Sequence, residues 1–194
     1  MLSGIGTLIA AATALFAIFK TYPDWKKQEI YKTRAREARD ILACYYEGQQ
    51  VIDSIRAPFV SAHELSEAEK VLGDNVKNMN NAELQRQSQR IAALTRINRH
   101  TQYWEKLFRL LPIAKAVFGD DEEKHLMDIL KARQEIFAAA ETYPNANDDL
   151  ARAVEGKLWK GASEPDSIQV LLDESASALR NTLSEYLRPE NTEP

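Results

Sequence analysis

The feature that most constrains this chain is an uncharged run of 18 residues (2–19) near its start, from Leu2 to Phe19. As an α-helix the run would be about 27 Å long, slightly shorter than the ~30 Å hydrocarbon core of a bilayer. It is followed by Tyr22 and Trp25, then by Lys26 and Lys27. Aromatic and basic residues of this kind occupy the membrane–water interface. The sequence therefore predicts a single transmembrane anchor over residues 1–21.

This run is compatible with two other interpretations. A cleaved signal peptide needs a basic segment before the apolar one, and no Lys or Arg precedes Leu2. A buried core helix or an amphipathic helix lying on the membrane surface is compatible with a run this short. We take the uncleaved anchor as the prediction. Residues 20–39 carry seven Lys or Arg against three Asp or Glu, so the positive-inside rule places the N-terminus outside and the C-terminal domain in the cytoplasm.

A helical projection divides the run into two faces, because successive residues are about 100° apart. Bulky aliphatic and aromatic side chains fall on one face. Small side chains fall on the other, and small residues let two helix backbones approach closely in lipid. The sequence therefore predicts a packing face for another copy or for a different membrane helix, formed by Gly6, Ala10, Ala14 and Ala17.

The rest of the chain has the periodicity of helices, with no segment that alternates as a strand would. Capping residues, Gly and Pro divide it into four long and two short helices. We expect an all-α fold in which residues 22–188 form an antiparallel bundle and residues 189–194 a polar tail. The predicted helices cover residues 24–56, 61–72, 82–111, 121–143, 147–160 and 166–188.

Spacing by three and four residues predicts which side chains face the bundle core. Pro23 is expected to introduce a kink or elbow between the anchor and the first long helix, and Pro112 to kink or end the third. In the third helix the predicted apolar side includes Trp104 and Phe108. The predicted stripe of the first long helix is Tyr31, Arg34, Ala38, Ile41, Tyr45, Gly48, Ile52 and Ile55.

The charge of the chain argues against nucleic acid as a partner. The formal net charge is −4, and most of the acidic excess lies beyond residue 118. One basic patch, formed by Arg96, Arg99 and Lys106 beside Tyr103, is a candidate site for an anionic partner. The alternative is that these cations form a solvated face that pairs with the acidic C-terminal helices.

No constellation of residues predicts a catalytic, metal or cofactor site. The only cysteine, Cys44, excludes an intrachain disulfide and is expected to pack in the core. Glu122 and His125 have the spacing of a di-iron ligand pair, but the required second pair is absent from the sequence. Neither a nucleophile elbow nor a phosphate-binding loop is present.

Three functional hypotheses follow from the sequence. The first is a non-enzymatic, membrane-tethered scaffold that holds an unknown cytoplasmic protein at the lipid surface. The second is a membrane-perturbing effector or channel component whose short anchors self-associate into a homo-oligomer. The third is an enzyme whose site is assembled from residues distant in sequence.

Overall fold

A computed structural model describes residues 2–188, except for the side chains of residues 2–21, 23, 24 and 148. Over this range the regular structure is helical. Two short 3₁₀ segments, η1 (Gly73–Asn78) and η2 (Tyr143–Asn145), follow α2 and α5. The α-helices are α1 (Leu2–Ile55), α2 (Ala62–Leu72), α3 (Asn81–Arg99), α4 (Thr101–Val117), α5 (Asp120–Thr142), α6 (Asp148–Leu158) and α7 (Ser167–Leu187).

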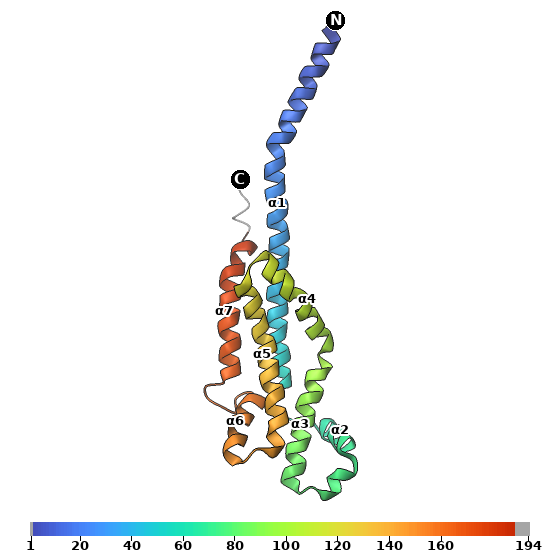
Figure 1. Ribbon diagram of the computed structural model, residues 1–194, viewed down its shortest axis with the longest axis vertical. Coiled ribbons are helices and arrows are strands. Elements are labelled where there is room, and N and C mark those ends of the chain that lie inside the picture. Colours follow the sequence, from blue (N-terminus) through green and yellow to red (C-terminus); the bar gives the residue numbers. More distant parts are fainter. Residues whose placement is uncertain (1, 189–194) are drawn as a thin grey trace.

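The helices form an antiparallel bundle of four arms, as expected from the sequence (Figure 1). The C-terminal half of α1 is the first arm, α3 and α4 together form the second, and α5 and α7 are the third and fourth. Helix α5 is central, because it packs against α1, α3, α4, α6 and α7. The short helices α2 and α6 lie at the end of the bundle away from the N-terminus.

Local start signals account for the beginnings of several helices. Ser61 caps α2 and forms a capping box with Glu64, the pattern that predicted this helix. Asn147 and Asp166 accept hydrogen bonds from backbone N–H groups at the starts of α6 and α7. Each cap satisfies a backbone donor that the first turn of a helix leaves without a partner.

The sequence predicted a kink or elbow near Pro23 and a new helix from about residue 24, but α1 is a single helix from Leu2 to Ile55. The ribbon changes direction within its blue N-terminal part (Figure 1). Proline removes one backbone hydrogen bond and crowds the preceding turn, which bends a helix but does not have to end it. The N-terminal segment and the bundle are therefore joined by one continuous helix.

The core stripe predicted for the first long helix is confirmed over its C-terminal part. Its members from Ala38 to Ile55 are buried. Tyr31 is only partly buried and Arg34 is exposed, and the Tyr31 hydroxyl donates to the Arg188 carbonyl at the end of α7, at 2.8 Å. Burial of this apolar stripe is the dominant favourable contribution to folding.

The predicted third helix is interrupted at His100, which ends α3 and precedes α4. The indole N–H of Trp104 donates to the Ile97 carbonyl across this break, at 2.9 Å. In α4, Leu107 faces the core and Phe108 is 53% exposed, so the inward position predicted for Phe108 is wrong. Pro112 lies inside α4 and does not end it.

Within the part of the chain that the structure describes in full, no helix combines the length and the apolar character needed to cross a bilayer. The predicted anchor of residues 1–21 and its packing face of Gly6, Ala10, Ala14 and Ala17 lie outside those residues. The anchor therefore stays a prediction from the sequence.

Candidate functional site

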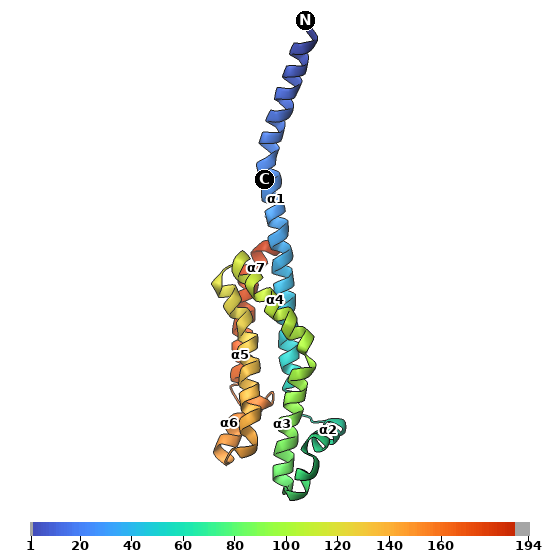
Figure 2. The same ribbon diagram turned by 45° about the vertical axis from the view of Figure 1, so that its right-hand side comes forward.

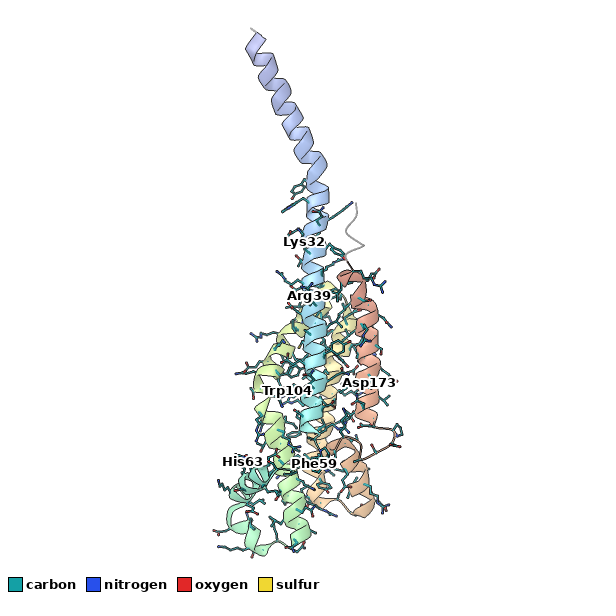
Figure 3. The ribbon with its side chains drawn as sticks, turned by 180° about the vertical axis from the view of Figure 1, so that it is seen from behind. Lys32, Arg39, Phe59, His63, Trp104 and Asp173 are labelled. Atoms are coloured by element: carbon teal, nitrogen blue, oxygen red, sulfur yellow. The ribbon has the colours of Figure 1, made fainter. Side chains whose placement is uncertain are left out.

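Between the apolar run and the bundle, α1 forms an exposed stalk of residues 22–37. Every residue from Trp25 to Ile30 is exposed, and Figure 3 shows Lys32 above the level at which the other arms begin. The rings of Tyr22 and Trp25 have centroids 6.1 Å apart. Both side chains are exposed, as are Lys26 and Lys27. All four predicted interface residues are therefore free of contact with the bundle.

The structure does not assemble the predicted anionic-partner patch. Arg96 is buried, with 7% of its surface exposed. Arg99 is exposed and lies 3.7 Å from Glu67, whereas Lys106 pairs with Glu47 on α1 at 2.6 Å. Tyr103 is buried against the Cys44 carbonyl. Arg96 is thus a structural residue, and the remaining two cations face different partners.

Arg96 holds the loop between α1 and α2 in place. Its guanidinium donates to both carboxylate oxygens of Glu64, at 2.7 and 3.0 Å. It also donates to the carbonyl oxygens of Ile55, Ala57 and Phe59. A planar guanidinium suits this bidentate geometry. One side chain therefore fixes the loop and attaches α2 to α3.

This ion pair predicts an acid-sensitive stability. Hydrogen bonds from Arg96 outweigh the effect of burial and lower the pKa of Glu64 to about 2. A carboxyl whose pKa is lowered in the folded state stabilises the fold above its unfolded pKa, near 4.5, and loses that contribution as the pH falls toward 2. We expect the free energy of unfolding to decrease by about 1.4 kcal/mol per pH unit in this window. Urea titrations between about pH 6 and pH 3 will measure this slope; if Glu64→Gln retains the same slope, other carboxyl groups are responsible.

A second buried arginine joins α1 to the segment between α6 and α7. Arg56 is fully buried and donates to the carbonyl oxygens of Gly156, Lys157 and Trp159. It also pairs with Asp166 at 2.9 Å. Burial opposes ionisation of Asp166, but hydrogen bonds from Arg56 and from the Gln169 N–H leave the pKa of this carboxyl below its usual value. The carbonyl groups at the end of α6 thus receive donors from a residue far away in sequence.

A histidine, an aspartate and a serine meet between α5 and α7, which the sequence did not indicate. Ser175 Oγ donates to Asp128 Oδ2 at 2.6 Å, and His125 Nδ1 lies 3.4 Å from the same Oγ. A nucleophilic serine needs the histidine as its base, with the aspartate behind the histidine. Here the serine bonds directly to the carboxylate and is 3% exposed. The cluster is arranged to satisfy buried polar groups.

Cys44 is buried in the bundle. Burial raises the pKa of its thiol, which keeps it protonated. A protonated thiol is a poor nucleophile and a poor metal ligand. Among the described residues, no three His, Cys, Asp or Glu side chains lie close enough together to hold a metal ion.

Two shallow apolar grooves follow the outer face of α5. The first, here the α4–α5 groove, measures about 340 Å³ and is lined by Phe108, Leu130, Arg133, Gln134 and Phe137. The second lies between α5 and α6, shares Gln134 with the first, and measures about 560 Å³. Grooves between helices that expose aromatic and aliphatic side chains are typical docking surfaces for another helix.

No protein-family model, curated protein or solved structure matches this chain. The features that bear on function are the exposed stalk, the buried networks of Arg56 and Arg96, and the exposed apolar surfaces.

Proposed function

We propose that this chain is a membrane-tethered helical interaction module that holds its bundle at a set distance from the bilayer. The observation that carries the proposal is the continuity of α1, which runs without interruption from the apolar segment into the bundle core. A movement or an association of the N-terminal segment is transmitted through such a helix to the bundle. A flexible linker would not transmit it.

The stalk supports this arrangement. From Trp25 to Ala38, which is buried in the bundle, 13 residues of helix span about 20 Å. Tyr22 and Trp25 are exposed on a stalk that contains many charged residues, and water is an unfavourable environment for the two rings. Immersion of the two rings at a headgroup layer removes this cost. Lys26 and Lys27 then face the anionic leaflet, where each cation contributes about 1 kcal/mol.

The orientation follows from the same charges. Basic residues from Lys20 to Arg39 flank the apolar run on its C-terminal side, which favours retention of the bundle in the cytoplasm. The length of the stalk would then place a partner of the bundle about 20 Å from the lipid surface. The packing face of the anchor would recruit a second anchor or a different membrane helix.

Membrane attachment is tested with the full chain by fractionation of cells and extraction of the membranes with alkaline carbonate. We expect the protein to stay in the membrane pellet and Leu8→Asp to shift it to the supernatant, because a charge in the anchor costs about 3 kcal/mol. Ile30→Asp is the matched control, since Ile30 is exposed on the stalk. It should not change the fractionation.

Orientation is tested in the same cells with external protease and a C-terminal epitope. Protection of the epitope in intact cells and its loss after permeabilisation are the expected results. Wild-type protein that is extracted by carbonate contradicts the anchor. Cleavage of the epitope in intact cells contradicts the cytoplasmic placement.

A further inference from the structure

Helix α2 packs on α3 and exposes several apolar side chains. Only Glu64 and Ala68 of this helix are buried, and no residue of η1 is. Val71 is 72% exposed, Leu65 is 40% exposed, and Phe59 just before the helix is 86% exposed. Figure 3 shows His63, the second residue of α2, at the edge of the molecule. Exposed apolar residues clustered on one short segment indicate a surface that another molecule covers.

The α4–α5 groove has the composition of a surface that receives such a segment. Phe108 and Phe137 are about half exposed at its two sides. Arg133 lies across the Trp104 ring, 4.9 Å from its centroid. Aromatic residues and arginine are the residues that dominate binding energy at protein interfaces.

The groove also has a charge preference. Within the described part of the chain, no carboxylate lies at ion-pair distance from Arg133. An apolar segment that carries an acidic side chain therefore fits this surface best. On α2, Glu69 is exposed and lies four residues after Leu65, so the two share one face of the helix. Helix α2 thus offers both the apolar surface and the acid.

The occupant cannot be the α2 of the same molecule. Helix α2 packs on α3, and α3 packs on α5, so α3 stands between α2 and the groove (Figure 2). The Arg96–Glu64 ion pair holds α2 on its own side of α3. Only the α2 of a second copy reaches the groove.

The two surfaces lie at matching levels along the bundle. On α3, Arg90 pairs with Glu141 of α5, and Arg96, six residues later, pairs with Glu64 of α2. Six residues of helix rise about 9 Å, and the four residues from Glu141 back to Phe137 rise about 6 Å in the same direction. Glu64 and Phe137 therefore lie at similar heights along the bundle. Two copies placed side by side with the same orientation bring α2 of each to the level of the other's groove.

We propose that a second copy of this chain docks here, with α2 and Phe59 of each copy covering the α4–α5 groove of the other around a two-fold axis parallel to the helices. Such an interface is closed, because each copy gives and receives the same contact. Both N-termini point the same way, which is compatible with two anchors in one membrane. The proposal does not depend on the anchor, although a shared membrane would raise the effective concentration of the two copies.

Site-specific cross-linking of the full chain tests this contact. Two differently tagged forms are co-expressed, one with Leu65→Cys and one with Phe137→Cys, and treated with a short bis-maleimide. Each copy then carries one introduced thiol, so a cross-link between the two tags joins two molecules. The native Cys44 is present in both tagged forms and is buried, so it contributes equally to any background reaction. We expect a cross-linked dimer that carries both tags, and its loss when Arg133→Glu is added to the Phe137→Cys form.

The matched control replaces Phe137→Cys by Val170→Cys on α7. Val170 is 45% exposed and Phe137 is 49% exposed, so the two thiols are similarly accessible. The proposal is overturned if the 65–170 pair cross-links as strongly as the 65–137 pair, or if neither pair gives a dimer. Because both introduced thiols replace exposed side chains, a folded protein is expected, and far-UV circular dichroism checks it. The test works equally on detergent-solubilised and on soluble protein, so its outcome is separate from that of membrane attachment.

Discussion

Gly48→Ala is expected to lower the free energy of unfolding by about 3 kcal/mol, although alanine is the better helix former. A Cβ at this buried position would overlap the hydroxyl of Tyr103 and lie 3.1 Å from Ile129 Cδ1. The Tyr103 ring cannot move aside easily, because it is buried and its hydroxyl donates to the Cys44 carbonyl at 3.2 Å. The close approach of α1 and α4 thus requires a residue without a side chain.

Thermal unfolding followed by far-UV circular dichroism measures this effect, which corresponds to a decrease in Tm of roughly 6–12 °C for a chain of this length. Gln50→Ala, on the exposed side of the same helix, is the control and should change Tm little. Tyr103→Phe in the Gly48→Ala background should recover part of the loss, because it removes the atom that the Cβ would overlap. An unchanged Tm for Gly48→Ala would show that α1 and α4 are farther apart than described here.

Arg56→Met is expected to cost about 3–5 kcal/mol, the range found when one member of a buried ion pair is removed. The methionine fills similar volume but removes the guanidinium donor from three carbonyl oxygens and from the Asp166 carboxylate. Arg56→Lys should lose less, since an ammonium keeps the charge but cannot reach all four acceptors together.

Urea unfolding at neutral pH measures both Arg56 variants. Lys160→Ala is the matched control, because Lys160 pairs with Asp53 and joins the same two segments of the chain through an exposed contact. Its loss should cost less than about 1 kcal/mol. If Arg56→Met and Lys160→Ala are equally stable, the buried network contributes nothing beyond a surface ion pair.

The buried Arg96–Glu64 ion pair also positions the exposed surface formed by Phe59 and α2. Arg96 binds the Phe59 carbonyl at 2.6 Å and Glu64 of α2, so the ion pair that stabilises the loop also presents Phe59 and α2 to the solvent. Loss of this pair at low pH should therefore release α2 before the rest of the bundle unfolds. The Arg96–Glu64 pair would then contribute both to stability and to the interaction with a second copy.

Much of the fold was predictable because its signals are local. Capping by Ser61, Asn147 and Asp166 marks helix starts through hydrogen bonds that span three residues. The stripe from Ala38 to Ile55 follows from helical periodicity alone. The break at His100 was missed, and so was the continuity of α1 through the kink expected at Pro23, since each depends on how a distorted turn is supported by its surroundings.

The candidate sites were much less predictable. Helical spacing places Arg96 on the same side as Arg99 and Lys106, which predicted a surface patch. Its burial depends on Glu64, 32 residues earlier, and pairs of that separation leave no trace in periodicity. The same holds for Arg56 with Asp166 and for Ser175 with Asp128.

The uncharged run that precedes the bundle is the feature that the sequence determined by itself. Its length, its lack of charge and its aromatic and basic flank are properties of consecutive residues, and they carry the prediction of a membrane anchor without any tertiary contact. Only the tertiary structure decided that this run continues as one helix into the core, and that α2 and the α4–α5 groove remain uncovered. Burial and pairing are set by residues that meet through folding, so they appear only when the helices are packed together.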